Sequence, residues 1–422
     1  MGNVEVGGAP SGIRSVRSPT SVLDRLRVGT SDERSRPSTD PTVLFTGFPG
    51  FLGSALLERV LDRGDGPVAC LVQPEYLEEA RGRARAIVSG RDGDRDESGS
   101  AGSDRNEAGS DGSDRAVHLY SGDITEPDLG LGGALDDDGS LSSVREIYHL
   151  AAVYDLGVDP ALAEAVNVRG TEHVLDAAER LDVDRFHYVS TCYVSGRYDG
   201  VFTETDLREG QSFNNHYEAT KHRAEVAVRE RMAKGFPAIV YRPSIVVGDS
   251  RTGETDKLDG PYNLLRLLLA QPRALSVLFG LPNSGRTEMN VVPRDFVVDA
   301  MAALSDHEGA VGETYQLCDP DPLCVPEFVD ALADAAGHRV VTLPTTKRVA
   351  RGGSRLLAGA GIRVDPATLD YLDHPTRYRC PETTRALAEC DAEVSVPSVG
   401  SYADALVRFA REHPNVRDEP MV

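Results

Sequence analysis

Lysine is almost absent from this chain. Among 422 residues the only lysines are Lys221, Lys234, Lys257 and Lys347, and arginine supplies the other 41 basic residues. Acidic residues outnumber basic ones by 67 to 45, which gives a formal net charge of -22. Such a surface repels a phosphate backbone, so the composition argues against nucleic acid as a partner.

The acidic, lysine-poor composition also indicates how salty the protein's surroundings are. Carboxylates keep a surface hydrated and mutually repelling, which a salt-rich cytoplasm favours. A genome biased toward arginine codons would leave a similar imbalance in an ordinary acidic enzyme, and both causes can act together. We predict a halophilic protein, and keep the codon bias as the alternative.

Paired cysteines and long apolar runs are also lacking. No C-x-x-C pair and no zinc-like cluster with the ten histidines occurs, so we expect free or buried thiols and no metal site. Residues 1–20 lack the apolar core of a secretory signal. The most apolar long stretch, 263–282, is interrupted by arginines and by Pro272, which predicts a pair of core or pocket-lining helices instead of a membrane span. We therefore expect a cytoplasmic protein with no membrane partner.

Two segments are of low complexity. Residues 1–40 are rich in Ser, Arg, Gly and Pro without periodicity, which predicts a disordered tail. Residues 91–115 contain repeated GSDR and predict a solvated insertion within a folded region.

The rest of the first 250 residues alternates strand and helix. Helical patterns cover 53–63, 160–181 and 215–234, and β-rich apolar runs occupy 42–46, 67–72, 117–120, 146–152, 185–190 and 238–247. This alternation predicts an α/β fold with a doubly wound parallel sheet over 41–250. For residues 251–422 we predict a smaller region of mixed, helix-rich structure that binds substrate. Part of this region should return to the main sheet. A ligand should bind where the first and fourth strands diverge.

A glycine-rich loop joins the first strand to the first helix. In TGFPGFLG, Gly47 would make the tight turn, Gly50 would let the backbone approach a pyrophosphate, and Gly53 would let helix and sheet pack closely. A glycine pattern alone is weak evidence, but its place between a strand and a helix favours dinucleotide binding. The first helical turn is not basic, so we expect binding to depend on backbone geometry. The predicted cofactor loop comprises Thr46, Gly47, Phe48, Pro49, Gly50, Phe51, Leu52 and Gly53.

Tyr217 and Lys221 stand four residues apart in YEATK, and therefore share one face of a helix. A protonated Lys221 would lower the pKa of the Tyr217 phenol, which makes the tyrosine a usable proton donor. The same ammonium could hold a ribose hydroxyl. An ordinary surface pair is the alternative, although this chain has few lysines to place there by chance.

Thr191 ends the fifth predicted strand, within VSTCYVSG. Its hydroxyl could donate to a substrate carbonyl oxygen alongside Tyr217. Ser-Thr pairs also end strands as ordinary turn formers. The order of glycine loop, Thr191 and Tyr217 with Lys221 favours the catalytic interpretation.

With these motifs, the chain resembles the extended short-chain dehydrogenase/reductases over roughly residues 42–412, apart from the insertion. GDIT, YHLAA, NVRGT and YRPSIVVG complete the resemblance. It implies a Rossmann fold that binds NAD(P), with Thr191, Tyr217 and Lys221 as the active trio. It also implies that Asp123 and Ile124 flank the adenine, that Ala151 and Ala152 line the cofactor, and that Pro243 and Ser244 lie near the nicotinamide.

Within that superfamily, FNNHYEATK and NVVPRDFVVDA resemble the fatty acyl-CoA reductase and thioester reductase branch. Members of this branch usually carry an arginine at the end of the second strand to meet a 2'-phosphate, where this chain has Gln73. No aspartate stands there to bind a ribose diol, so the resemblance favours NADP over NAD.

The resemblance predicts an NAD(P)H-dependent reductase of a small-molecule acyl thioester or related carbonyl. No adenylation or carrier domain lies within the chain, so we expect the substrate to arrive as a free thioester. Two alternatives stay open: a nucleotide-sugar epimerase or hydroxysteroid-type dehydrogenase, and a non-catalytic dinucleotide-binding regulator.

Overall fold

A computed structural model describes residues 41–64, 66–98, 117–136, 139–154, 157–281, 283–346, 349, 368–390, 392–414 and 416, with side chains undescribed in 91–98. The predicted tail lies outside these residues. The predicted insertion lies mostly outside them too, but its first residues belong to helix α2, which runs to Ser98. Residues Thr39–Val422 form one compact unit.

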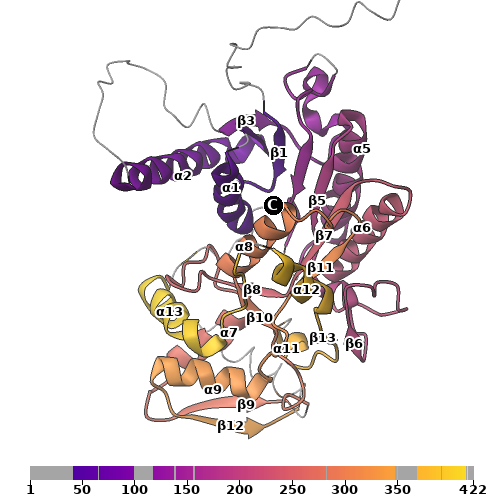
Figure 1. The fold of residues 1–422 in the computed structure, drawn as a ribbon. Helices are drawn as coiled ribbons and strands as arrows, with labels where there is room; N and C mark the ends of the chain where they lie inside the picture. The colour runs from indigo at the N-terminus through magenta and orange to yellow at the C-terminus, as the bar shows by residue number, and fades with distance from the viewer. Residues whose placement is uncertain are drawn as a thin grey trace, which may run out of the picture. The chain divides into compact units, whose positions relative to one another are not determined.

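Seven parallel strands form the main sheet in the order β11-β7-β5-β4-β1-β2-β3. Every residue of β1 and β2 is buried, as expected for central strands that are covered on both faces. The neighbours of β1 are β2 and β4, so the strand order reverses there (Figure 1). The strands are β1 Val43–Thr46, β2 Val68–Val72, β3 Val117–Ser121, β4 Glu146–His149, β5 Arg185–Val189, β7 Ala238–Pro243 and β11 Thr314–Leu317.

Helices cover both faces of the sheet, which confirms the predicted doubly wound α/β fold. The helices that share a core with one face are α1 Phe51–Arg63, α2 Leu77–Ser98, α8 Arg294–Ser305 and α12 Pro381–Glu389. Those that cover the other face are α4 Pro160–Ala163, the π-helical segment η4 Glu164–Gly170, α5 Thr171–Leu181 and α6 His216–Met232.

A third core holds the helix-rich C-terminal region together. It includes residues of three helices, α7 Pro261–Leu269, α9 Val325–Ala336 and α13 Val399–Glu412, and the same region contains two small parallel pairs. These pairs are β8 Ile245–Val247 with β10 Val291–Pro293, and β9 Ser276–Gly280 with β12 Val340–Pro344. No described helix is long and apolar enough to cross a membrane.

The remaining elements are short and lie outside the main sheet. One more small pair joins β6 Val201–Phe202 to β13 Arg377–Tyr378, and its core includes residues of η5. The short helices are η1 Pro74–Tyr76, η2 Pro127–Gly130, η3 Gly132–Leu135, η5 Cys192–Ser195 and α11 Thr368–Tyr371.

Two predicted elements differ from the structure. The run 238–247 divides at Ser244, because β7 stays in the main sheet whereas β8 pairs with β10. The helix pair predicted over 263–282 is wrong in its second half: α7 ends at Leu269, and residues 276–280 form strand β9. Pro272 cannot continue a helix, and the alternation of buried and exposed residues after it is that of a strand.

Candidate active site

A cavity of about 780 Å³ opens at the carboxyl ends of the parallel strands, beside the point where the strand order reverses. Residues of α7 and α11 line its other side. Every residue that the sequence singled out for catalysis or cofactor binding lines this cavity: Thr46, Gly47, Phe48, Pro49, Gly50, Phe51, Leu52, Gly53, Gln73, Asp123, Ile124, Ala151, Ala152, Thr191, Tyr217, Lys221, Pro243 and Ser244.

The glycine loop packs too tightly for side chains. Gly47 has a φ of +90°, and a Cβ there would lie 2.8 Å from the backbone nitrogen of Ala151. A Cβ at Gly53 would lie 2.2 Å from the carbonyl oxygen of Gly47. Gly50 begins α1 without a side-chain cap, so the first N–H groups of the helix remain available to an anion.

A buried polar network braces the strand ends behind the loop. The Thr46 hydroxyl lies 2.8 Å from Nδ1 of His149, whose Nε2 lies 3.0 Å from the Thr171 hydroxyl. The backbone N–H of Ala151 donates to Thr46 at 3.2 Å. Burial lowers the pKa of His149 to about 3, so this imidazole is neutral at ordinary pH. The network fixes the backbone against which a cofactor would lie.

Thr191 and Tyr217 come together from different elements. Thr191 follows β5 and accepts a hydrogen bond from the backbone of Tyr193 at 3.2 Å. Tyr217 lies in the first turn of α6, and it lines the same cavity as Thr191. Lys221 lies one turn further along the helix and donates to the carbonyl oxygen of Val189 at 2.6 Å. The spacing of the two motifs thus brings two hydroxyls and one amine to the same cavity.

The charge states differ from the sequence-based expectation. Burial raises the pKa of Tyr217, and the neighbouring Thr191 hydroxyl offsets only part of that shift. Burial also lowers the pKa of Lys221 to about 7, with the nearby Glu225 carboxylate acting in the opposite direction. The predicted lowering of the Tyr217 pKa is therefore not found. Lys221 is itself too poorly solvated to remain fully charged near neutral pH.

A buried ion pair supports the catalytic helix. Arg242 and Glu225 both have fully buried side chains, and they meet at 2.6 Å. The Ser190 hydroxyl donates to the same carboxylate at 2.6 Å. Arg242 is on β7, Ser190 follows β5 and Glu225 is on α6, so this pair ties both strand ends to the helix that carries Tyr217.

One buried polar atom in the cavity wall lacks a hydrogen-bond partner within the described part of the chain, which indicates that a ligand binds there. Ser244 is 6% exposed, and its hydroxyl has no hydrogen-bond partner among the described residues. It lies where the chain leaves β7 for β8, at the position for which the family resemblance predicts a place near the nicotinamide. An unpaired buried hydroxyl is costly, so a group that it can hydrogen-bond is expected there. Together with the glycine cradle, this fits an NAD(P) cofactor.

Sequence reasoning missed Arg83, a basic side chain beside the glycine loop. Its guanidinium donates to the carbonyl oxygen of Pro49 at 3.2 Å and pairs with Asp256 at 2.9 Å. We expected binding to depend on the backbone alone, because the first turn of α1 carries no basic residue. The cation comes from α2, and nothing in the sequence distinguishes Arg83 from the neighbouring Arg81 and Arg85 of that helix.

Three more cavity residues carried no sequence signal. Tyr154 packs edge-on against Tyr217, with ring centroids 5.1 Å apart. Lys257 lies 5.5 Å above the Tyr154 ring. Tyr371 donates to the buried carboxylate of Glu218 at 2.9 Å and so attaches α11 to the start of α6.

Among the residues that the structure describes, no cluster of His, Cys, Asp and Glu could hold a metal ion.

Comparison with known proteins gives the family. The model of the NAD-binding family described as male sterility protein matches residues 45–301, more than half of the chain. The chain belongs to this family. The match confirms the predicted membership of the extended short-chain dehydrogenase/reductases, in their thioester reductase-like branch.

Relatives share modest identity over most of the chain. A component of the linear gramicidin synthase of Brevibacillus parabrevis is 26% identical over 92% of this chain and 7% of its own length. Carboxylic acid reductase of Mycobacterium tuberculosis is 30% identical over 74% of this chain and 27% of its own length. The chain thus spans less than a third of the length of either protein.

One solved structure matches nearly end to end. The terminal R domain from the myxalamid PKS-NRPS biosynthetic pathway is 26% identical to this chain, with a TM-score of 0.69. The alignment covers 90% of this chain and 93% of that chain. The shared region therefore includes the helix-rich C-terminal part as well as the sheet.

Proposed function

We propose that this protein is an NAD(P)H-dependent reductase of acyl thioesters. The observation that carries the proposal is the shared cavity in which Thr191 and Tyr217 face a glycine-rich dinucleotide cradle. The similarity to carboxylic acid reductase supports the substrate class.

Different residues of the cavity would bind different parts of the cofactor. The N-terminus of α1 would hold the pyrophosphate, Lys221 a ribose hydroxyl and Ser244 the nicotinamide end. Bound NAD(P)H would supply a hydride to the carbonyl carbon of the substrate. Arg83 favours NADP, because a guanidinium is suited to a phosphate and sits beside the loop without being buried.

Two side chains of the protein would stabilise the negative charge that develops on the substrate oxygen. As the carbonyl accepts the hydride, Tyr217 donates its proton to that oxygen and Thr191 donates a hydrogen bond to it. The raised pKa of Tyr217 keeps the phenol protonated until negative charge develops on the substrate oxygen. Collapse of the resulting hemithioacetal breaks the C–S bond, releases a thiol and leaves an aldehyde.

The test combines two substitutions with a thiol assay. Tyr217→Phe removes the proton donor but keeps the ring, so turnover should fall about 10²–10⁴-fold while NADPH still binds. Thr191→Ala should cost roughly 10²–10³-fold. Acyl-CoA-dependent NADPH oxidation and free thiol are measured together. Tyr120→Phe, on β3 and away from the cavity lining, serves as the control.

Other outcomes would assign other functions. Redox-neutral conversion of a nucleotide sugar would favour an epimerase, and oxidation of a sterol-like alcohol a dehydrogenase. Cofactor binding without turnover on any of these would favour a regulator. Thiol release that persists undiminished in Tyr217→Phe would contradict the proposed chemistry.

A further inference from the structure

Two stretches of this acidic chain contain no acidic residue at all. Residues 260–287 carry three arginines, and residues 335–364 carry five arginines and one lysine. At the average of the whole chain, stretches of this combined length would hold about nine Asp and Glu. All 67 acidic residues lie elsewhere, so these segments are basic in a protein whose net charge is -22.

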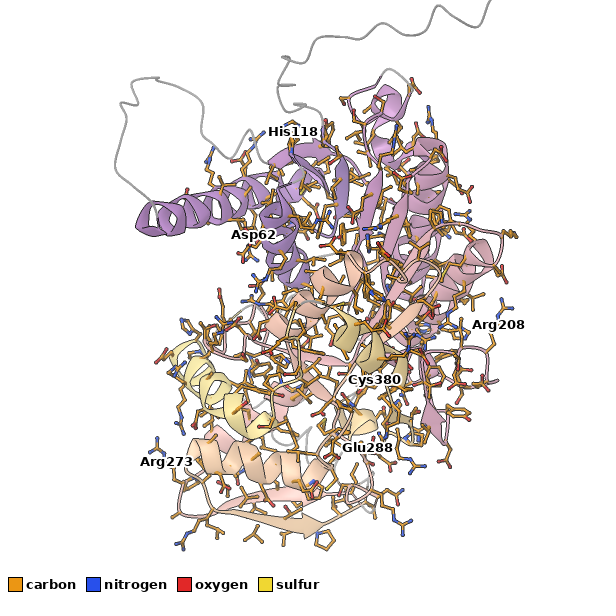
Figure 2. All side chains as sticks on the ribbon, in the orientation of Figure 1. Asp62, His118, Arg208, Arg273, Glu288 and Cys380 are labelled. Atoms are coloured by element: carbon orange, nitrogen blue, oxygen red, sulfur yellow. The ribbon has the colours of Figure 1, made fainter. Side chains whose placement is uncertain are left out.

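The fold pairs a described segment of the first stretch with a described segment of the second. Strand β9 belongs to the first and β12 to the second, and they pair in parallel over five residues. At the start of this two-stranded ribbon, the backbone N–H of Arg339 donates to the carbonyl oxygen of Arg273 at 2.9 Å. Both arginines are exposed. Figure 2 shows Arg273 near the end of the ribbon, which lies beside α9 in Figure 1.

One face of the ribbon is apolar and exposed. Ser276 and Leu278 point inward and are buried, whereas Leu275 and Phe279 are 55% and 49% exposed. Leu343 on β12 is the partner of Phe279, and Val341 is the partner of Val277, so they share that face. Of the nine large hydrophobic side chains that are exposed among the described residues, four lie here: Leu275, Phe279, Val341 and Leu343.

The size of this face argues against a protein partner. Five residues at about 3.3 Å each and two strands about 4.8 Å apart give a face of roughly 160 Å². A stable protein interface buries about 800 Å² on each partner. A second copy would also bring like charges together at Arg273 and Arg339. Insertion at a lipid surface needs no such area, because apolar contact and charge attraction act together.

We propose that the outer ribbon face, Leu275, Val277, Phe279, Val341 and Leu343, rests on an anionic lipid surface. The apolar side chains enter the headgroup boundary, and the arginines beside them meet lipid phosphates. The rest of the protein, acidic and hydrated, stays in water. The contact is peripheral, and it differs from our sequence-based expectation that the protein has no membrane partner.

The experiment uses the full chain and large unilamellar vesicles. Flotation is compared between vesicles of phosphatidylcholine alone and vesicles that also contain phosphatidylglycerol, at 0.1 M and 1 M KCl. The protein should float with the anionic vesicles, and less so at high salt, because screening weakens the charge attraction.

Two pairs of substitutions separate the apolar and basic contributions. Phe279→Asp with Leu343→Asp should weaken binding at least tenfold. Arg273→Glu with Arg339→Glu should weaken it roughly 20-fold. The matched controls change equally exposed groups elsewhere: Val311→Asp and Arg208→Glu, the latter on a different part of the molecule in Figure 2. All of these side chains are exposed, and an unchanged melting temperature verifies the fold.

Three results would overturn the proposal. The first is an absence of flotation with anionic vesicles at either salt concentration. The second is binding that the controls weaken as much as the ribbon variants do. The third is a dimer in light scattering that Phe279→Asp dissociates, which would assign the face to a second copy of the chain.

Discussion

Lys221 lines the cavity and is almost completely buried. Its pKa lies near 7 in the folded protein, against an ordinary value of 10.5. Burial causes the shift, and Glu225 opposes it only partly. The lysine is therefore poised to gain or lose charge near neutral pH, where a surface lysine would stay protonated.

This shift predicts a pH dependence of stability. Between pH 7 and 10.5 the unfolded chain binds the lysine proton and the folded protein does not, so raising the pH stabilises the fold. From pH 7 to 9 the gain should be on the order of 2 kcal/mol. Urea denaturation measures it as the difference between the wild type and Lys221→Met, which carries no titrating group there. If the free energy of unfolding of the two proteins changed with pH in the same way, the lowered pKa of Lys221 would be contradicted.

Arg83 allows a test of cofactor choice. Arg83→Gln should raise the KM for NADPH by roughly 10- to 100-fold and leave that for NADH nearly unchanged, since only NADPH carries the 2'-phosphate. Arg81→Gln, which removes an exposed pair with Glu78 on the same helix, is the control. Equal losses for both cofactors would mean that the contacts of Arg83 with Pro49 and Asp256 are structural.

At the scale of elements, the glycine loop and α1 depend on close backbone contact. Gly53→Ala would place a methyl group 2.2 Å from the carbonyl oxygen of Gly47, so the loop must shift. We expect a loss of about 1–3 kcal/mol of stability together with weaker cofactor binding. Thermal unfolding and cofactor fluorescence measure the two effects.

Gly82 is the matched control for that substitution. It lies within α2, and a Cβ there would meet no atom within 4 Å. Gly82→Ala should therefore stabilise the protein by about 0.5–1 kcal/mol, the usual gain when alanine replaces glycine in a helix. Equal effects at the two positions would show that crowding at Gly53 does not decide its identity.

The break between β7 and β8 is the element that sequence reasoning could not locate. Residues 238–247 form one apolar run in the sequence. Its periodicity cannot show that the run contains two strands that belong to different sheets. The structure divides it because Pro243 pairs with Leu317 whereas Ile245 pairs with Val291. That change of partners places the unpaired Ser244 hydroxyl in the cavity wall.

At the scale of the whole molecule, the net charge of -22 predicts a dependence on salt. Carboxylates repel one another at low ionic strength, and added salt screens them. We expect the melting temperature to rise between low and molar KCl, as calorimetry can measure. A flat or falling melting temperature would favour codon bias as the source of the composition.

The doubly wound sheet, the family and the principal residues of the site could all be predicted from the order of residues along the chain. Strand-helix alternation, the glycine loop and the spacing of Tyr217 and Lys221 are local patterns, and local patterns follow from backbone geometry. The folded structure was needed to show that Arg83 reaches the glycine loop, that Tyr371 contacts Glu218 across 153 positions, and that two acid-free stretches share one ribbon. Such contacts join segments far apart in the chain, and only the packing of the elements brings them together.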